Sequence, residues 1–135
     1  MNGDRLAAAA EALAGVPFRL HGRDPGTGLD CIGVLAAALA AMGRNAPLPN
    51  GYALRARFLP ELGAIAGACG FAEAGGTIHP GDVLFVRMGP CQFHMVIAAR
   101  QGGFVHAHAG LKRVTLFDGP LAWPVAGHWR LVDAC

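Results

Sequence analysis

The sequence predicts an α+β fold in which helices pack on one antiparallel sheet. Two observations support this prediction. The first half of the chain is rich in alanine and reads as helical, whereas the second half consists of short β-like runs between turn signals. Since the 135 residues contain no internal repeat and no linker long enough to divide them, we expect a single domain over residues 1–135.

The helical half is defined by its start and stop signals. Asp30 is a preferred N-cap residue, and Gly43 is a typical C-terminal stop. A loop dense in Gly and Pro precedes Asp30, and Pro60 interrupts or ends the last helical stretch. Helices are therefore expected over residues 4–14, 30–43 and 52–68.

The β half begins after the Gly-rich stretch at residues 75 and 76. The sequence RQGG at residues 100–103 is a hairpin signal between two of the β-like runs. Strands are expected over residues 83–87, 94–99, 103–109, 112–117 and 128–134.

Composition and charge exclude several classes of protein. Charged residues make up 15% of the chain, the formal net charge is +2, and Lys112 is the only lysine. This charge is too weak and too scattered for a nucleic-acid or polybasic membrane surface, so we expect neither partner. The longest apolar run, Cys31–Met42, is far shorter than the roughly 20 residues that span a bilayer. The N-terminal residues read as an amphipathic helix rather than a signal peptide, so we expect cytoplasmic synthesis with reduced thiols.

Cys31 falls on the first turn of the second expected helix. The unpaired N–H groups and the positive dipole end of that turn favour a thiolate and are expected to lower the thiol pKa. The same N–H groups can hold a developing oxyanion, and Gly33 leaves the turn uncrowded. A small side chain that only fills a contact between helix and sheet is the alternative.

Three histidines share one expected hairpin. A five-residue loop over residues 99–103 would pair Val96 with His106 and bring His94, His106 and His108 to one face. One of them can act as general base for a thiol and a second can orient it. Two alternatives stay open: half-exposed strand histidines, and a zinc site that also uses Cys91.

Three motifs resemble those of the NlpC/P60 family of cysteine peptidases. VPFRLHGRDPGTGLDCIGVL (residues 16–35) resembles the family's nucleophile segment, a Gly-rich loop followed by Asp-Cys-Ser-Gly at a helix start. PGDVLFV (residues 80–86) resembles its Pro-Gly-Asp motif, and HMVIAARQGGFVHA (residues 94–107) resembles its His-Val-Gly-Ile strand and return strand. Twelve positions separate His94 from His106, close to the family's spacing.

The resemblance implies a papain-like fold, with Cys31 as nucleophile, His94 as general base and His106 as the orienting residue. His108 has no counterpart in the family and is a substitute candidate for His106. The chain departs from the family at Phe18, where the family has Tyr, and at Ile32, where it has Ser.

Several polar residues near these motifs are candidates for substrate contact. Two arginines flank the Gly-rich loop and suit the carboxylates of an anionic peptide. A histidine in that loop can partly replace the missing tyrosine hydroxyl. The candidate substrate-binding residues are Arg19, His21, Arg23, Asp30 and His108.

The resemblance also implies a reaction. Family members commonly cleave bacterial cell-wall peptides, often between D-glutamate and a diamino acid, through an acyl-enzyme and without a metal or cofactor. As a bare catalytic domain the chain looks most like the phage-type subgroup, found also in gene-transfer particles. That subgroup implies phage-like tail proteins as partners and action in the periplasm of a target cell.

Three other functions remain open from the sequence. A structural or assembly component of a phage-like tail would keep the fold without catalysis. A metal-binding module would use the cysteine and histidine side chains as ligands. Transferase or amidase chemistry would use the same cysteine and histidine with a different acceptor.

Overall fold

The computed structural model describes residues 2–20, 22–44, 66–89, 92–108, 110–118, 121 and 123–132. Two helices and eight strands are defined within these ranges. The helices are α1 (Asn2–Glu11) and α2 (Cys31–Ala41). The strands are β1 (Arg23–Asp24), β2 (Gly28–Leu29), β3 (Phe71–Glu73), β4 (Val83–Gly89), β5 (Gln92–Ala98), β6 (Phe104–His108), β7 (Arg113–Phe117) and β8 (Val125–Leu131).

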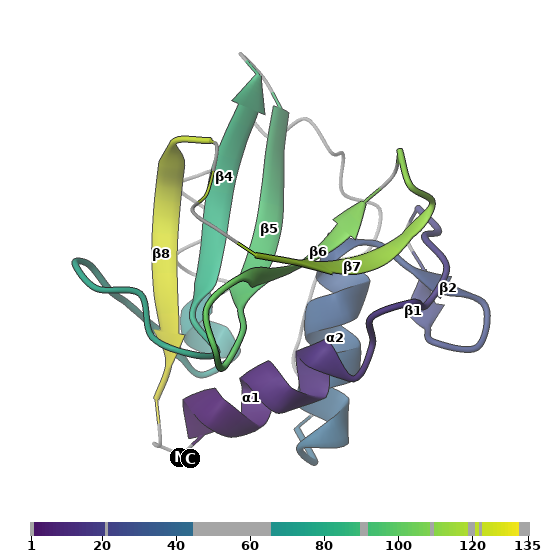
Figure 1. Ribbon diagram of the computed structural model, residues 1–135. Coiled ribbons are helices and arrows are strands. Elements are labelled where there is room, and N and C mark those ends of the chain that lie inside the picture. Colours follow the sequence, from purple (N-terminus) through teal and green to yellow (C-terminus); the bar gives the residue numbers. More distant parts are fainter. Residues whose placement is uncertain are drawn as a thin grey trace.

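The large sheet is antiparallel and has six strands in the order β3-β8-β4-β5-β6-β7. Strands β1 and β2 form a separate two-stranded sheet. In Figure 1, β8, β4 and β5 run side by side, while β6 and β7 turn toward α2 and α1 crosses below them. This arrangement confirms the predicted α+β class; the single-domain assignment over residues 1–135 stays a prediction.

The two faces of the sheet bury different clusters because side chains alternate along a strand. We call the face that carries Met95 and Ile97 the inner face, since these side chains pack with residues of both helices. The opposite, outer face carries a smaller cluster: Leu84, Val86, Val96, Ala98 and Phe104. Partly buried side chains from the segment after β6, among them Trp123, pack against the outer cluster.

The predicted elements agree with the structure in kind and differ at their ends. The first helix ends at Glu11 rather than at residue 14, and a turn carries the chain to Gly15, whose N–H bonds the Val114 carbonyl in β7. The last strand covers Val125–Leu131 rather than residues 128–134. Strands β1, β2 and β3 were not predicted, because two or three residues are too few to show alternation. The helix predicted over residues 52–68 lies almost entirely outside the described residues.

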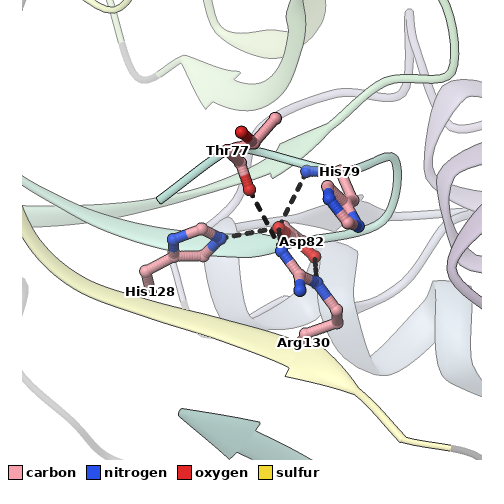
Figure 2. A network of polar contacts seen from close by, with 5 residues as sticks. All are labelled: Thr77, His79, Asp82, His128 and Arg130. Carbon is pink, nitrogen blue, oxygen red and sulfur yellow. Dashed lines mark hydrogen bonds and ion pairs between the residues drawn. The ribbon is translucent and has the colours of Figure 1, made fainter. Parts of the chain in front are cut away.

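Asp82 ties the start of β4 to β8 through a buried polar network (Figure 2). Its side chain is fully buried, accepts from Arg130 at 2.9 Å through both carboxylate oxygens, and lies 2.6 Å from His128 Nε2. The His79 N–H also donates to it at 2.9 Å, so Asp82 holds the turn before β4 as well.

These contacts set the charge state of Asp82. Burial alone would raise the pKa of the carboxyl group, but the hydrogen bonds from Arg130, the His79 N–H and His128 outweigh burial and hold the pKa below its ordinary value. A depressed carboxyl pKa stabilises the fold at pH values above the unfolded-state pKa, and that stability is lost as pH falls through the folded pKa.

No helix among the described residues is long and apolar enough to cross a membrane.

We predict that Asp82→Asn lowers the free energy of unfolding by about 3 kcal/mol, because it leaves Arg130 and His128 facing a neutral amide. Urea unfolding at pH 7 measures this loss. The gap between the variant and the wild type should narrow as the pH falls through the lowered pKa of Asp82, since the wild-type carboxylate then also loses its charge. Glu73→Gln, at an exposed position of β3, is the control and should change the stability by less than about 0.5 kcal/mol. A loss for Asp82→Asn no larger than that of the control would contradict the assignment.

Candidate active site

The first turn of α2 is fixed by Asp30, as the sequence predicts. Asp30 has extended backbone angles, φ −100° and ψ −168°, and its Oδ1 accepts from the Gly33 N–H at 2.8 Å. Its carbonyl accepts the first helical bond from the Val34 N–H at 2.9 Å. Because the Asp30 side chain is fully buried, the cap satisfies an N–H group that water cannot reach.

Gly33 allows the loop before α2 to lie directly on this turn. A Cβ atom at Gly33 would collide with the carbonyl oxygen of Gly22, which lies just before β1. Any side chain at residue 33 would therefore push the loop away from the helix. The sequence prediction that Gly33 leaves the turn uncrowded is therefore corrected: the Gly22 carbonyl occupies the space that a side chain would need.

Cys31, the first residue of α2, is a buried free thiol with 7% of its surface exposed. Backbone N–H groups of Met95, Ile32 and Cys31 itself point at its sulfur and favour the thiolate. Met95 lies in β5 directly after His94. The capped start of α2 therefore delivers the thiol to the strand that carries the predicted base.

The Met95 N–H is available because β5 and β6 separate at this point. Their ladder consists of the pairs Val96–His106, Ile97–Val105 and Ala98–Phe104, and it stops before His94. The Ala98 N–H bonds the Asp82 carbonyl on the β4 side, so alternation turns the Ile97 and Met95 N–H groups toward β6. The Met95 N–H therefore has the Cys31 sulfur as its partner instead of a carbonyl oxygen of β6.

The predicted direction of the Cys31 pKa shift is wrong for this structure. Burial and then the nearby Asp30 carboxylate raise the pKa of the thiol to about 11, and the N–H groups only partly oppose them. The sequence indicated the helix start but not the depth of burial. The site therefore holds a neutral thiol rather than a preformed thiolate.

His94 and His106 form a hydrogen-bonded pair above the sheet. His106 Nε2 lies 3.3 Å from His94 Nδ1, and the two rings meet edge to face with centroids 5.3 Å apart. The prediction that these two residues share one face is confirmed, as is the predicted Val96–His106 register. No contact among the described residues joins Cys31 Sγ directly to the His94 ring; the thiol meets β5 through the backbone of the next residue.

His108 occupies the third position on this face. Its ring centroid is 5.3 Å from that of His106, and its Nδ1 accepts from the Leu111 N–H at 3.0 Å. If the β5–β6 ladder continued, His108 would pair with His94, but the strands have separated there. Between the two candidates for orienting His94, the hydrogen bond therefore favours His106.

Both paired imidazoles are held neutral. Burial lowers the pKa of His94, and the positive charge that His108 can carry lowers it further. Burial, followed by the charges of His94 and His108, lowers the pKa of His106 to about 4. Because both imidazoles are neutral at pH 7, neither has to lose a proton before it can accept one.

The structure places the predicted substrate-binding residues in different settings. Arg19 is exposed, and its N–H bonds the Leu29 carbonyl; Arg23 is half-buried in β1, opposite Leu29. His21 lies outside the described residues. Asp30 is buried as the helix cap, and a direct substrate contact for it stays a prediction. Phe18 is half-buried against the inner cluster.

Among the described residues, no group of three or more His, Cys, Asp or Glu side chains could hold a metal ion. Cys91, which the zinc hypothesis requires, lies outside the described part of the chain.

Sequence reasoning missed two contributors to the site. The Met95 N–H is a backbone group, which no residue pattern reveals. Trp123 comes from the segment after β7 and places its ring 5.9 Å from that of His106. Only the path of that segment over the outer face, which the sequence does not give, brings them together.

Comparison with solved structures identifies the fold. NlpC2 from Trichomonas vaginalis superposes with a TM-score of 0.67 at 19% identity, over 96% of this chain and 48% of that chain. The NlpC/p60 domain of the peptidoglycan hydrolase SagA gives 0.58 at 24% identity, over 87% and 90% of the two chains. The peptidoglycan hydrolase RipB from Mycobacterium tuberculosis gives 0.61 at 22% identity, over 98% and 65%.

The chain thus has the papain-like fold of NlpC/P60 domains, as the resemblance implied. It spans 45% of the length of NlpC1 and 48% of the length of NlpC2, both from Trichomonas vaginalis. No protein-family model and no curated protein matches its sequence.

Proposed function

We propose that the protein is a cysteine peptidase that hydrolyses amide bonds in bacterial cell-wall peptides. The observation that carries the proposal is the position of the Cys31 thiol, at the capped start of α2 and against the β5 backbone beside the His94–His106 pair. The NlpC/P60 fold supports it, since SagA and RipB, which share this fold, are peptidoglycan hydrolases.

The first half of the reaction forms an acyl-enzyme. His94 takes the proton of Cys31 as the sulfur attacks the amide carbonyl, because a thiol with a pKa of about 11 is not ionised beforehand. The N–H groups around the sulfur then hold the oxyanion. Protonated His94 gives its proton to the leaving amine, and the C–N bond breaks.

The second half releases the acid product. A water molecule gives a proton to His94 and attacks the thioester, and the proton then returns to the Cys31 sulfur as the C–S bond breaks. For His94 to work through Nε2, its Nδ1–H must donate to His106 Nε2 across the 3.3 Å contact. His106 is thus a positioning residue that fixes the tautomer of His94.

The finer elements of the proposal are the scissile bond and the setting. We take the bond to be that between D-glutamate and a diamino acid, and the setting to be a phage-like tail particle made in the cytoplasm that acts in the target's periplasm. The sequence resemblance supports both. An inactive tail component is the competing function, and Phe18 in place of the family's Tyr favours it. Acyl transfer to another amine is the competing reaction of the same residues.

We predict that the purified protein cleaves a wall tripeptide at this bond, with products identified by mass. Cys31→Ala should fold normally and be inert, because the proposed acyl-enzyme forms on the Cys31 sulfur. Cys69→Ala is the matched control: it also removes a free thiol that is 7% exposed, and it should keep its activity. Equal loss of activity in both variants would sink the nucleophile assignment, and no turnover by the wild type would favour the structural function.

We predict that His106→Ala lowers kcat about a hundredfold, because His94 loses the partner that fixes its tautomer. His106→Asn should recover part of this loss, since its side chain can still accept a hydrogen bond. His108→Ala should lower kcat less and should move the acid limb of kcat/KM upward, because the charge of His108 adds to burial in lowering the His94 pKa. A larger kcat loss in His108→Ala would transfer the orienting role to His108.

A further inference from the structure

Trp123 reaches the histidine pair from two strands away. Its backbone is held beside β4, because the carbonyl of the next residue, Pro124, accepts from the Arg87 N–H at 2.9 Å. Its ring packs on the outer cluster and lies 5.9 Å from the ring of His106 in β6, at an interplanar angle of 68°. Since β5 lies between β4 and β6, the indole crosses β5 to make this contact.

A cavity of about 440 Å³ opens directly beside His106. It is lined by the rings of Phe117, Trp123 and His108 as well as by His106 itself. His106 nevertheless keeps only 2% of its surface exposed. The rings of Phe117 and Trp123 lie 6.1 and 5.9 Å from the His106 ring and 6.5 Å from one another. These two rings therefore form an apolar wall between the imidazole and solvent that enters the cavity.

The charge of His106 decides the direction of its hydrogen bond to His94. Neutral His106 can leave Nε2 without a hydrogen, so that Nε2 accepts from the His94 Nδ1–H across the 3.3 Å contact. Protonated His106 carries a hydrogen on both ring nitrogens, and its Nε2–H would donate to His94 Nδ1 instead. Neutral His94 would then carry its hydrogen on Nε2 and could not accept the thiol proton there. The proposed base therefore requires a neutral His106.

Burial is the largest cause that keeps His106 neutral. It lowers the pKa of His106 to about 4, with smaller contributions from positive charge on His94 and His108. Arg113, which pairs with His108 across β6 and β7, lines the same cavity and is a further positive group on this face. Truncation of the indole would reduce the burial of His106 and leave these three side chains in place.

We propose that Trp123 is a positioning residue, whose ring keeps solvent from His106 and so keeps His106 Nε2 an acceptor for His94. The inference rests on the proposed peptidase function, because that function uses His94 Nε2 as the base. It goes further in giving control of the tautomer of the base to a residue outside the three sequence motifs, which end at Ala107. The alternative is that Trp123 only packs the outer face.

Nuclear magnetic resonance of the imidazole nitrogens tests this role without requiring turnover. The nitrogen-15 shifts of the full chain report the protonation of His106 and the tautomer of His94. They are followed from about pH 5 to pH 8, a range that lies above the His106 pKa of about 4. His106→Asn identifies the signals of His106. Leu121→Ala is the matched control, because Leu121 also packs on the outer cluster from the segment between β7 and β8.

In the wild type, His106 should stay neutral over this range and His94 should carry its hydrogen on Nδ1. Trp123→Ala should raise the protonated fraction of His106 at pH 6 about tenfold, because solvent then stabilises the imidazolium, and should move the His94 hydrogen toward Nε2. Trp123→Phe should keep most of the wild-type behaviour, since it retains an apolar ring. If Trp123→Ala does not fold, Trp123→Val should show the same change to a smaller degree.

Unchanged imidazole signals in the truncated variant would overturn the positioning role of Trp123. An equal change in Leu121→Ala would overturn it as well, because the indole would then act only through general packing. Turnover is measured separately: in an active wild type, Trp123→Ala should move the acid limb of kcat/KM upward. If the wild type shows no turnover but the expected imidazole signals change on truncation, the result supports the role of Trp123 and counts against the peptidase function.

Discussion

The capped first turn of α2 is the constraint on which the site depends. The Asp30 carboxylate has no access to water and holds the Gly33 N–H at 2.8 Å, and this fixes where the helix begins. Because the helix begins at Cys31, the thiol enters the gap between β5 and β6 and takes the Met95 N–H that the sheet leaves unused. Moving the helix start by one residue would rotate the sulfur by about 100° around the helix axis, away from this strand.

Burial gives the site a different electrostatic character from that of an exposed helix start. Desolvation raises the pKa of the Cys31 thiol to about 11 and lowers that of His106 to about 4, so thiol and imidazoles are all neutral at rest. Charge then develops only as the proton moves from the Cys31 sulfur to His94. Backbone N–H groups already surround the sulfur and can stabilise this charge. The Asp82 network shows the opposite outcome: there Arg130 and His128 compensate burial, and the carboxyl pKa falls.

Much of this arrangement could be predicted from the sequence. The Asp30 cap, the shared face of His94 and His106, and the Val96–His106 register follow from capping preference and two-residue periodicity. The burial of Cys31 could not be predicted, because it arises from contacts between segments that are distant in the chain. The ring contact between Trp123 and His106 could not be predicted for the same reason: a strand pattern does not show which segment crosses above it.

The central claim is that Cys31 is a buried, neutral thiol that His94 must deprotonate during the reaction. The rate of iodoacetamide labelling of Cys31 in the native protein, followed by peptide mass mapping from pH 5 to pH 11, tests it most directly. The account predicts very slow labelling at pH 6 and a rate that rises throughout this range, as expected for a thiol pKa of about 11. Rapid labelling of Cys31 at pH 6, independent of pH up to neutrality, would show a preformed thiolate–imidazolium pair and contradict the account.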